Sequence, residues 1–166
     1  MRRRRCRWTG RFAVSRSPQG GLRLRHSRTI ALAAEPSVFY ADASALVKRV
    51  VEEPESEALD RFLAGEPYVL ATSRIAIVEV TRAVRLASPS PDSDAEAMRL
   101  LNSCLLVEVT DPLLRQARRL TSERVRSLDA IHLATASYVA ADAVLVYDRR
   151  LAAACAAEGH VVTAPS

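Results

Sequence analysis

The sequence has few of the residues that mark two common classes of protein. It contains only three cysteines, Cys6, Cys104 and Cys155, an odd number without the close spacing of a zinc site or a disulfide framework. This favours a reducing compartment, and we expect the protein in the cytoplasm. No stretch approaches the roughly 18 uninterrupted apolar residues that a membrane-spanning helix needs. These absences argue against a disulfide-stabilised secreted domain and against a membrane protein.

Lysine is also nearly absent, and the positive charge is unevenly placed. Lys48 is the single lysine beside 23 arginines, and ten of those arginines lie within residues 1–37 together with one acid. Residues 1–37 therefore carry a net charge of +9, whereas residues 38–166 carry −4. The formal net charge of +5 averages a basic leader and an acidic domain. It is weak evidence that the domain itself binds nucleic acid.

The leader, residues 1–37, shows no sustained helical or strand periodicity, and we expect it to be disordered in isolation. Three interpretations are open: a nucleic-acid-binding arm, a targeting segment, or a stretch translated from a mis-assigned start. The runs RFAVS and TIALAA supply no convincing hydrophobic region for a secretory signal. The arginine-rich and alanine-rich composition indicates a GC-rich genome, in which spurious upstream reading frames are long. A valine codon at Val38 could then serve as the start.

From Val38 onward, strand-like and helix-like segments alternate along the chain. We expect strands over residues 38–41, 67–71, 105–109, 144–147 and 161–163. We expect helices over residues 44–53, 55–65, 73–87, from about 95, from 111, 127–140 and 151–159, with Ser73 capping the third and Asp111 capping the fifth. This alternation predicts an α/β fold with a mostly parallel central sheet flanked by helices. The length suffices for one such domain, which we assign to residues 38–166.

Four acidic residues follow short apolar runs or open helix-like segments: Asp42, Glu79, Asp129 and Asp148. A carboxylate directly after a buried strand lies at the carboxyl end of that strand, where open α/β sheets bind their ligands. Several carboxylates that converge there would repel one another unless a divalent cation neutralised them. We therefore expect the four carboxyl groups to lie within reach of one cation. Such a metal site predicts hydrolytic chemistry.

Each of these acids also has a simpler structural explanation. Glu79 could be a core-facing acid that pairs with Arg82 or Arg126. The three aspartates could respectively cap a helix, face a helix dipole and complete a turn. Four acids together at sheet-end or inward-facing positions favour a shared site over four separate explanations.

Four segments of the sequence resemble PIN-domain ribonucleases, specifically VapC-type toxins of bacterial toxin–antitoxin modules. They are DASALVK, the glutamate in SRIAIVEVTRA, RSLDAIHLATA and YDRRLAAAC. The resemblance covers residues 38–166 in the order and spacing of the family, and it implies a PIN-like three-layer sandwich. One position departs from the family, which often has a threonine or serine two residues before the last aspartate. Here that position is Val146.

The resemblance implies a metal-dependent endoribonuclease toxin with Asp42, Glu79, Asp129 and Asp148 as its catalytic acids. Asp42 and Asp129 are the expected primary ligands of Mg²⁺ or Mn²⁺. The expected partners are RNA, a small cognate antitoxin and a second copy of the chain in a homodimer or hetero-oligomer. The alternatives are a catalytically inert PIN-like RNA- or protein-binding module, and a phosphatase of the haloacid dehalogenase type. The phosphatase would need a second aspartate where this chain has Ser44.

Other residues near these motifs have open roles. His132 follows Asp129 by three residues, and packing or support of the site is a more frequent role for such a histidine than catalysis. An amphipathic surface with Leu59, Phe62 and Leu63 could receive the antitoxin or could be core. Basic side chains near the acids could contact phosphates or stay solvated: Lys48, Arg49, Arg82, Arg126, Arg149 and Arg150.

Overall fold

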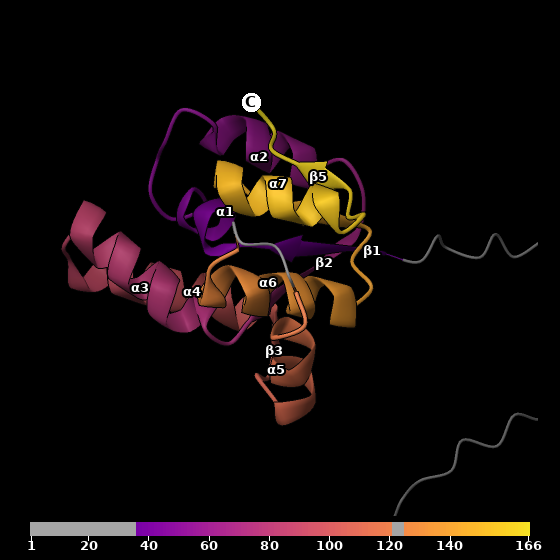
Figure 1. Cartoon of the computed structure of the whole chain (residues 1–166). Helices are drawn as coiled ribbons and strands as arrows, with labels where there is room; N and C mark the ends of the chain where they lie inside the picture. The colour runs from indigo at the N-terminus through magenta and orange to yellow at the C-terminus, as the bar shows by residue number, and fades with distance from the viewer. Residues whose placement is uncertain (1–35, 121–124) are drawn as a thin grey trace, which may run out of the picture. The chain divides into compact units, whose positions relative to one another are not determined.

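The computed structural model describes residues 36–120 and 125–166, and five strands in these residues form one sheet (Figure 1). The strands are β1 (Ser37–Ala41), β2 (Tyr68–Ser73), β3 (Leu105–Val107), β4 (Ala143–Leu145) and β5 (Val162–Thr163). Their order across the sheet is β3-β2-β1-β4-β5, and every pairing is parallel. The chain moves outward from β1 to β3 on one side and from β4 to β5 on the other. The switch point between β1 and β4 is where such sheets bind their ligands.

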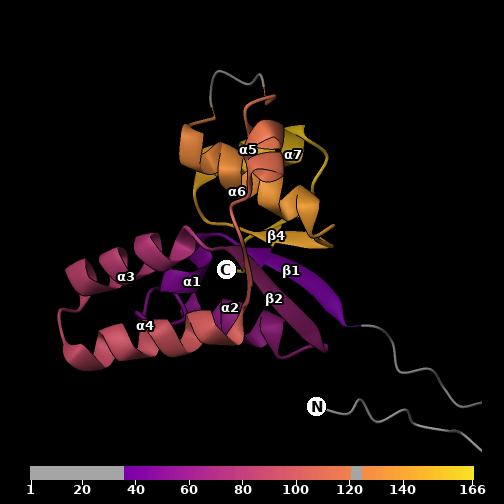
Figure 2. The same ribbon diagram turned by 90° about the horizontal axis from the view of Figure 1, so that it is seen from below.

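Seven helices cover the two faces of this sheet within the described residues. They are α1 (Ala43–Val47), α2 (Ser56–Leu63), α3 (Ala76–Ala87), α4 (Pro91–Ser103), α5 (Asp111–Ala117), α6 (Ser127–Tyr138) and α7 (Arg149–Ala157). Figure 2 shows α1 to α4 on one side of the strands and α5 to α7 on the other. The predicted three-layer α/β sandwich with a parallel sheet is therefore confirmed.

Alternation along the strands sends neighbouring side chains into two separate cores. Ala41, Leu70 and Leu145 pack against the layer that contains α1 to α4. Tyr40 and Val144 point to the opposite face and pack against α6 and α7. Because both faces are covered, the strands read as nearly continuous apolar runs in the sequence.

The predicted antitoxin groove over residues 44–63 proves to be largely core. Leu59 and Leu63 are buried against the sheet. Phe62 is partly exposed, and its ring centroid lies 5.3 Å from that of Phe39. The interpretation of Leu59 and Leu63 as core residues is the correct one.

The expected helix over residues 44–53 is too long, because α1 ends at Val47. The carbonyl of Lys48 accepts a hydrogen bond from the Ser56 hydroxyl at 2.7 Å instead of from an amide one turn further along. The Lys48 side chain also turns back to bond Glu53 and Glu55. These contacts, between residues five to eight positions apart, replace the next helical turn.

Three helix starts also differ from expectation. Ser73 is the last residue of β2 and does not cap α3, which begins at Ala76. Helix α4 begins at Pro91 rather than near residue 95, because the Ser90 side chain accepts from the Ser93 amide at 3.1 Å and proline suits a first turn. Thr110, rather than Asp111, occupies the cap position of α5.

The predicted leader, apart from its last two residues, lies outside the described residues, and so does Cys6. The domain boundary at Val38 stays a prediction. Cys155 is buried in the core and Cys104 is half-buried. In residues 36–120 and 125–166, no helix combines the length and the apolarity needed to cross a membrane.

Candidate active site

Asp42 is the first residue after β1 and lies at the switch point of the sheet. Its amide donates to the Leu145 carbonyl of β4 at 3.0 Å. One carboxylate oxygen, Oδ2, accepts from the Ser44 amide at 3.1 Å and from the Ser44 hydroxyl at 2.7 Å. Only 6% of the residue is exposed. The helix cap proposed for this aspartate is real, and it fixes the carboxylate in place rather than excluding it from a site.

Asp148 follows β4, the neighbouring strand, and caps α7. Its Oδ1 accepts from the amides of Arg150 and Leu151 at 2.8 and 3.0 Å. The hydrogen bond from Leu151, helped by the amide and charge of Arg150, lowers the pKa of Asp148. The Tyr147 amide donates to the Ser44 hydroxyl at 2.9 Å. Ser44 therefore ties the segment before Asp148 to Asp42.

Glu79 lies in the first turn of α3 and reaches His132 of α6. Its Oε2 lies 2.8 Å from Nε2 of His132, and the same nitrogen lies 3.5 Å from Oδ1 of Asp42. The other ring nitrogen, Nδ1, lies 2.6 Å from the Tyr40 hydroxyl. His132 is only 2% exposed, so its ring is a fixed bridge between two carboxylates and the core.

Two opposing effects act on the pKa of His132. Burial lowers it, whereas the hydrogen bond to Glu79 and the charges of Asp42, Glu79 and Asp129 raise it, and the net direction is upward. The pKa of Tyr40 is raised well above its usual value by burial and by the charge of Asp42, which keeps its hydroxyl neutral. A protonated His132 would donate from both ring nitrogens, to Tyr40 and to Glu79.

Asp129 lies in the first turn of α6 and is paired with an arginine of α7. Its Oδ2 accepts from the Arg126 amide at 3.1 Å and from Nε of Arg150 at 2.9 Å. The guanidinium of Arg150 also lies 3.7 Å from Oδ2 of Asp148. The Arg150 side chain is 33% exposed. It is therefore a bridge at the surface, unlike the buried ring of His132.

The four predicted acids are thus gathered at one end of the sheet as two pairs. We call Asp42, Glu79 and His132 the buried half of the site, after its buried bridge His132, and Asp129, Asp148 and Arg150 the open half, after its partly exposed bridge Arg150. The side chains of Glu79 and Asp129 are themselves 26% and 14% exposed. A single pocket is lined by residues of both halves and of the segments between them: Ser44, Lys48, Glu79, Tyr147 and Asp148. Burial raises the pKa of the Cys155 thiol to about 12, and the charges of Asp42 and Asp129 add to this effect.

The expectation that all four carboxyl groups lie within reach of one cation is not met in this arrangement. Across the described parts of the chain, no three groups from histidine, cysteine and the acids are placed as ligands of one ion. The physical reason is that His132 stands between Asp42 and Glu79, while Arg150 stands between Asp129 and Asp148. The donor set nevertheless fits Mg²⁺ or Mn²⁺, because carboxylate oxygens are the ligands these ions prefer.

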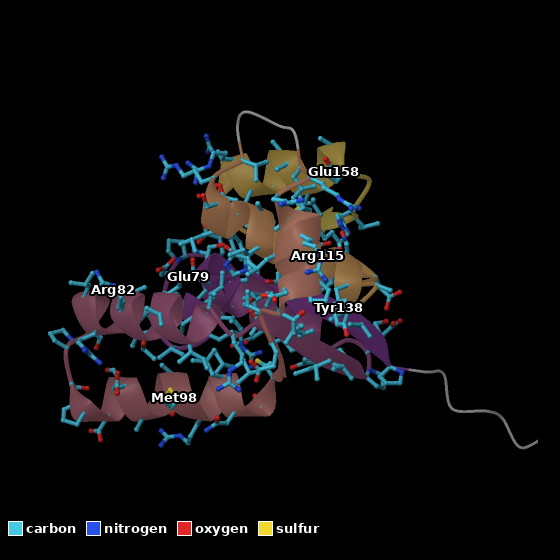
Figure 3. The ribbon with its side chains drawn as sticks, turned by 60° about the horizontal axis from the view of Figure 1, so that its bottom comes forward. Glu79, Arg82, Met98, Arg115, Tyr138 and Glu158 are labelled. Carbon is cyan, nitrogen blue, oxygen red and sulfur yellow. The ribbon has the colours of Figure 1, made fainter. Side chains whose placement is uncertain are left out.

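Arginine is not the partner of Glu79, although two arginines were candidates. Among the described residues, Glu79 pairs with His132 and not with Arg82 or Arg126. Figure 3 shows Glu79 at the end of α3 nearest the other helices, with Arg82 further along α3. The Asp129 to His132 spacing indicated a shared helix face, but it did not reveal that the ring would contact acids from two other segments.

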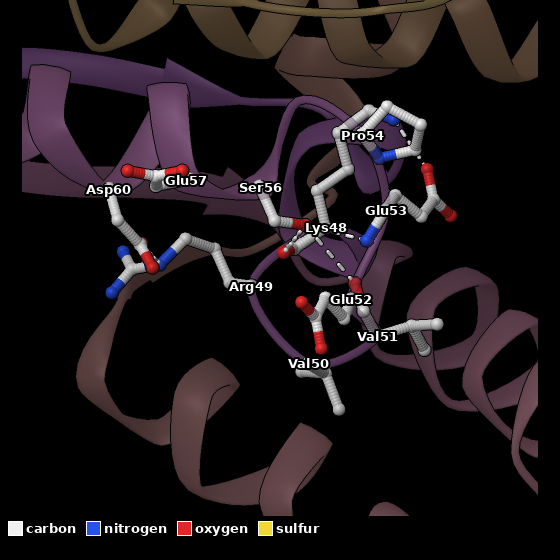
Figure 4. Close-up of a pocket in the computed structure, with 10 residues that line it drawn as sticks. All are labelled: Lys48, Arg49, Val50, Val51, Glu52, Glu53, Pro54, Ser56, Glu57 and Asp60. Carbon is white, nitrogen blue, oxygen red and sulfur yellow. Dashed lines mark hydrogen bonds and ion pairs between the residues drawn. The ribbon is translucent and has the colours of Figure 1, made fainter.

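Lys48 lies beside the site as a buried residue rather than as a solvated charge. It bonds Glu53 and also Glu55, the latter at 2.7 Å, and its ammonium lies 4.7 Å from the centre of the Tyr147 ring. Figure 4 shows Lys48 among the residues that line a second pocket, next to Glu53 and Ser56. Lys48 therefore supports the wall of the site and is already neutralised by its two acids.

Val146 occupies the position at which the resembled family often has a hydroxyl. Its side chain is buried in the core against α6 and α7, in the same cluster as Leu133 and Leu151. The Ser44 hydroxyl lies between the two strand ends instead: it donates to Asp42 and accepts from the Tyr147 amide.

The fold described above is that of a PIN domain. The model of the family described as PIN domain matches residues 39–157, and the chain belongs to this family. Ribonuclease VapC47 of Mycobacterium tuberculosis is 34% identical over 133 residues, covering 77% of this chain and 97% of the relative. Ribonuclease VapC46 of the same species is 37% identical over 132 residues, covering 78% and 99%.

Solved structures share the same fold at lower sequence identity. VapC20 of Mycobacterium tuberculosis, described as a sarcin-ricin loop cleaving toxin, superposes with a TM-score of 0.63 at 20% identity, over 76% of this chain and 99% of that chain. VapBC2 of Rickettsia felis, described as bound to a DNA fragment from its promoter, gives 0.61 at 10% identity, over 78% and 99%. These likenesses show the fold alone.

Proposed function

We propose that the domain formed by residues 38–166 is a Mg²⁺- or Mn²⁺-dependent endoribonuclease that acts as the toxin of a toxin–antitoxin pair. The observation that carries this proposal is the gathering of Asp42, Glu79, Asp129 and Asp148 at the switch point of the sheet. The relatives named ribonucleases support RNA as the substrate. A catalytically inert binding module would be expected to lose some of these acids, whereas this chain keeps all four.

Asp42 and Asp129 are the residues that would hold the cation, one from each half of the site. When bound, the cation would polarise the scissile phosphate and lower the pKa of an attacking water. Glu79 and Asp148 would orient that water and complete the negative charge of the site. Ser44 and His132 hold Asp42 and Glu79 in place, and the exposed Arg126 and Arg149 offer charges to the RNA backbone.

The proposed partner is a small cognate antitoxin. Structures with the same fold include one described as a toxin–antitoxin complex from Klebsiella pneumoniae, at 18% identity. Arginine is the side chain best suited to lie against clustered carboxylates, so an antitoxin arginine would block this site effectively. We also propose a homodimer or toxin–antitoxin hetero-oligomer, acting in the cytoplasm without a membrane partner.

The proposal is tested by cleavage of single-stranded RNA with Mn²⁺, with EDTA, and with two variants. Asp42→Asn keeps the size and the hydrogen bonds of the cap but removes the charge. Glu158→Gln is the matched control, because Glu158 is exposed just after the far end of α7. We expect cleavage to require the metal, to fall by about 100-fold or more in Asp42→Asn, and to stay unchanged in Glu158→Gln.

Two results would contradict the proposal. Equal cleavage by the wild type and Asp42→Asn would point to a contaminating nuclease. A wild-type protein that binds RNA but never cleaves it, at any Mn²⁺ concentration, would favour the inert PIN-like binding module.

A further inference from the structure

Arg150 occupies the open half of the site in a way that sets it apart from the other basic residues. Among the described residues, it is the only arginine that forms ion pairs with two of the four acids. Its Nε lies 2.9 Å from Asp129, and its guanidinium lies 3.7 Å from Asp148. Its neighbour Arg149 is exposed and makes no ion pair within the described residues. The sequence offers the two arginines as equals, and the structure separates them.

Neither acid depends on Arg150 for its orientation. Oδ2 of Asp129 also accepts from the Arg126 amide at 3.1 Å. Oδ1 of Asp148 accepts from two amides at the start of α7. If the guanidinium moved away, backbone groups would still hold both carboxylates near their present positions. In the open half, backbone amides therefore orient both acids, and the Arg150 guanidinium could leave without changing that orientation.

The bridge in the buried half differs in mobility. His132 is 2% exposed and is held by Tyr40 from behind, so its ring has no path out of the site. The Arg150 side chain is long, flexible and one third exposed, and it can turn into solvent without disturbing the core. A cation that enters the site must therefore displace Arg150 rather than His132.

We propose that Arg150 is an internal counter-ion that a divalent metal displaces from Asp129 and Asp148, and that the released guanidinium then binds a phosphate of the RNA. This inference rests on the proposed metal-dependent cleavage of RNA. In the metal-free protein the guanidinium offsets the charge of the two acids. In the loaded protein the metal takes over this role, and Arg150 presents its planar fork of donors beside the pocket, where it suits a phosphate. Arg150 thus links metal loading to RNA binding.

The exposure of the Arg150–Asp129 ion pair sets how strongly Arg150 can compete with a metal ion. A partly exposed ion pair changes an equilibrium by a factor of about five at most. This is strong enough to weaken metal binding measurably, and weak enough for a divalent cation to overcome.

The test measures Mn²⁺ dissociation constants by calorimetry for the wild type, Arg150→Gln and Arg149→Gln. Both variants lose one positive charge at adjacent positions, so general electrostatics predicts the same gain in affinity for each. Direct competition predicts binding about fivefold tighter in Arg150→Gln and changed by less than about twofold in Arg149→Gln. Arg150→Lys, which keeps the charge but loses the fork, should fall between the wild type and Arg150→Gln, and it serves if the glutamine variant fails to fold.

The second measurement is the split between KM and kcat for RNA at saturating Mn²⁺. Loss of a phosphate contact predicts that Arg150→Gln raises KM by about tenfold while kcat changes little. Tighter metal binding together with weaker RNA binding is a signature that a purely structural role of Arg150 would not give.

The other outcomes contradict the competition, the nuclease or both. Equal Mn²⁺ affinity in the two glutamine variants removes the competition, even if the nuclease is active. Weaker Mn²⁺ binding in Arg150→Gln means that Arg150 orients the ligands instead of competing with the metal. Tighter Mn²⁺ binding with no cleavage by any variant supports the competition and contradicts the nuclease. Absence of Mn²⁺ binding in both the wild type and Arg150→Gln contradicts both proposals.

Discussion

Asp42 and Glu79 lie against the buried ring of His132, whereas Asp129 and Asp148 are held by an arginine that is one third exposed. Both halves contain carboxylates, but they differ in the side chain that bridges them. The core holds His132 in the buried half, whereas Arg150 in the open half is partly exposed and can change its conformation. In the buried half, contacts reach through His132 to Tyr40 on β1. In the open half, backbone amides at the starts of α6 and α7 hold the acids, and the counter-ion is one third exposed.

This difference assigns separate tasks to the two halves. Asp42 is 6% exposed, so its interactions are weakly screened by water and its position varies little. The side chain of Asp148 is 44% exposed and accessible to solvent. Under the proposed function, the half bridged by His132 would keep a fixed position during the reaction, and the half bridged by Arg150 would admit the metal and the substrate.

The largest expected effect is on cleavage, where the two halves should respond unequally. Asp42→Asn should reduce kcat by about 1,000-fold, within the range for removal of a pre-organised charged group. Asp148→Asn keeps the cap of α7 and should cost about 10- to 100-fold. Steady-state cleavage of one RNA at saturating Mn²⁺ measures both. Equal losses in the two variants would remove the distinction between the halves.

The second effect is on the stability of the metal-free protein. His132→Gln should lower the free energy of unfolding by about 2 kcal/mol, because Tyr40 and the two acids lose their shared buried partner. Arg150→Gln should change it by less than about 0.5 kcal/mol, as expected for a partly exposed ion pair. Urea unfolding of both variants with EDTA makes the comparison. A larger loss for Arg150→Gln would contradict the assignment of the open half as adjustable.

The third effect tests how far the buried half extends into the core. Tyr40→Phe removes the hydroxyl that lies 2.6 Å from Nδ1 of His132 and should cost about 1 kcal/mol of stability. In a double-mutant cycle with His132→Gln, the two losses should be less than additive, because both remove the same hydrogen bond. Strict additivity would mean that Tyr40 does not support the ring.

The smallest effect is a pH dependence in the wall beside the site. The hydrogen bond from Lys48 lowers the pKa of Glu55 below its usual 4.5. Because the folded pKa is the lower one, this contribution is fully present above pH 4.5 and is lost as the pH falls through the folded pKa. The melting temperature of the wild type should therefore fall on acidification in this window. Glu55→Gln should flatten that part of the plot of melting temperature against pH. An unchanged profile in Glu55→Gln would place the acid sensitivity elsewhere.

Much of the fold follows from local pattern, and so does the placement of the acids. The apolar runs at residues 38–41 and 144–147 predict two buried strands, and a parallel sheet must bring their carboxyl ends together, which places Asp42 near Asp148. Helices α6 and α7 also lie close to their expected ranges. These features depend on periodicity and on short-range caps, which a single sequence displays.

The features that were not predicted depend on side-chain contacts that the apolar pattern of a segment does not reveal. The length of α1 is set by Ser56 and by the pairing of Lys48 with Glu53 and Glu55, none of which alters the helical pattern of residues 44–53. The role of His132 depends on Glu79, 53 residues away. Arg149 and Arg150 are adjacent and alike in the sequence. Their positions in the first turn of α7 point only Arg150 towards Asp129.

The central claim is that the two halves form one metal site for RNA cleavage, with Arg150 as the removable charge. The most direct test is a crystal structure with Mn²⁺, in which anomalous scattering locates the metal. We predict a Mn²⁺ peak in contact with carboxylate oxygens of both Asp42 and Asp129, with His132 in place and Arg150 turned away from Asp129. A Mn²⁺ ion bound elsewhere, while Arg150 still bridges Asp129 and Asp148, would contradict the account.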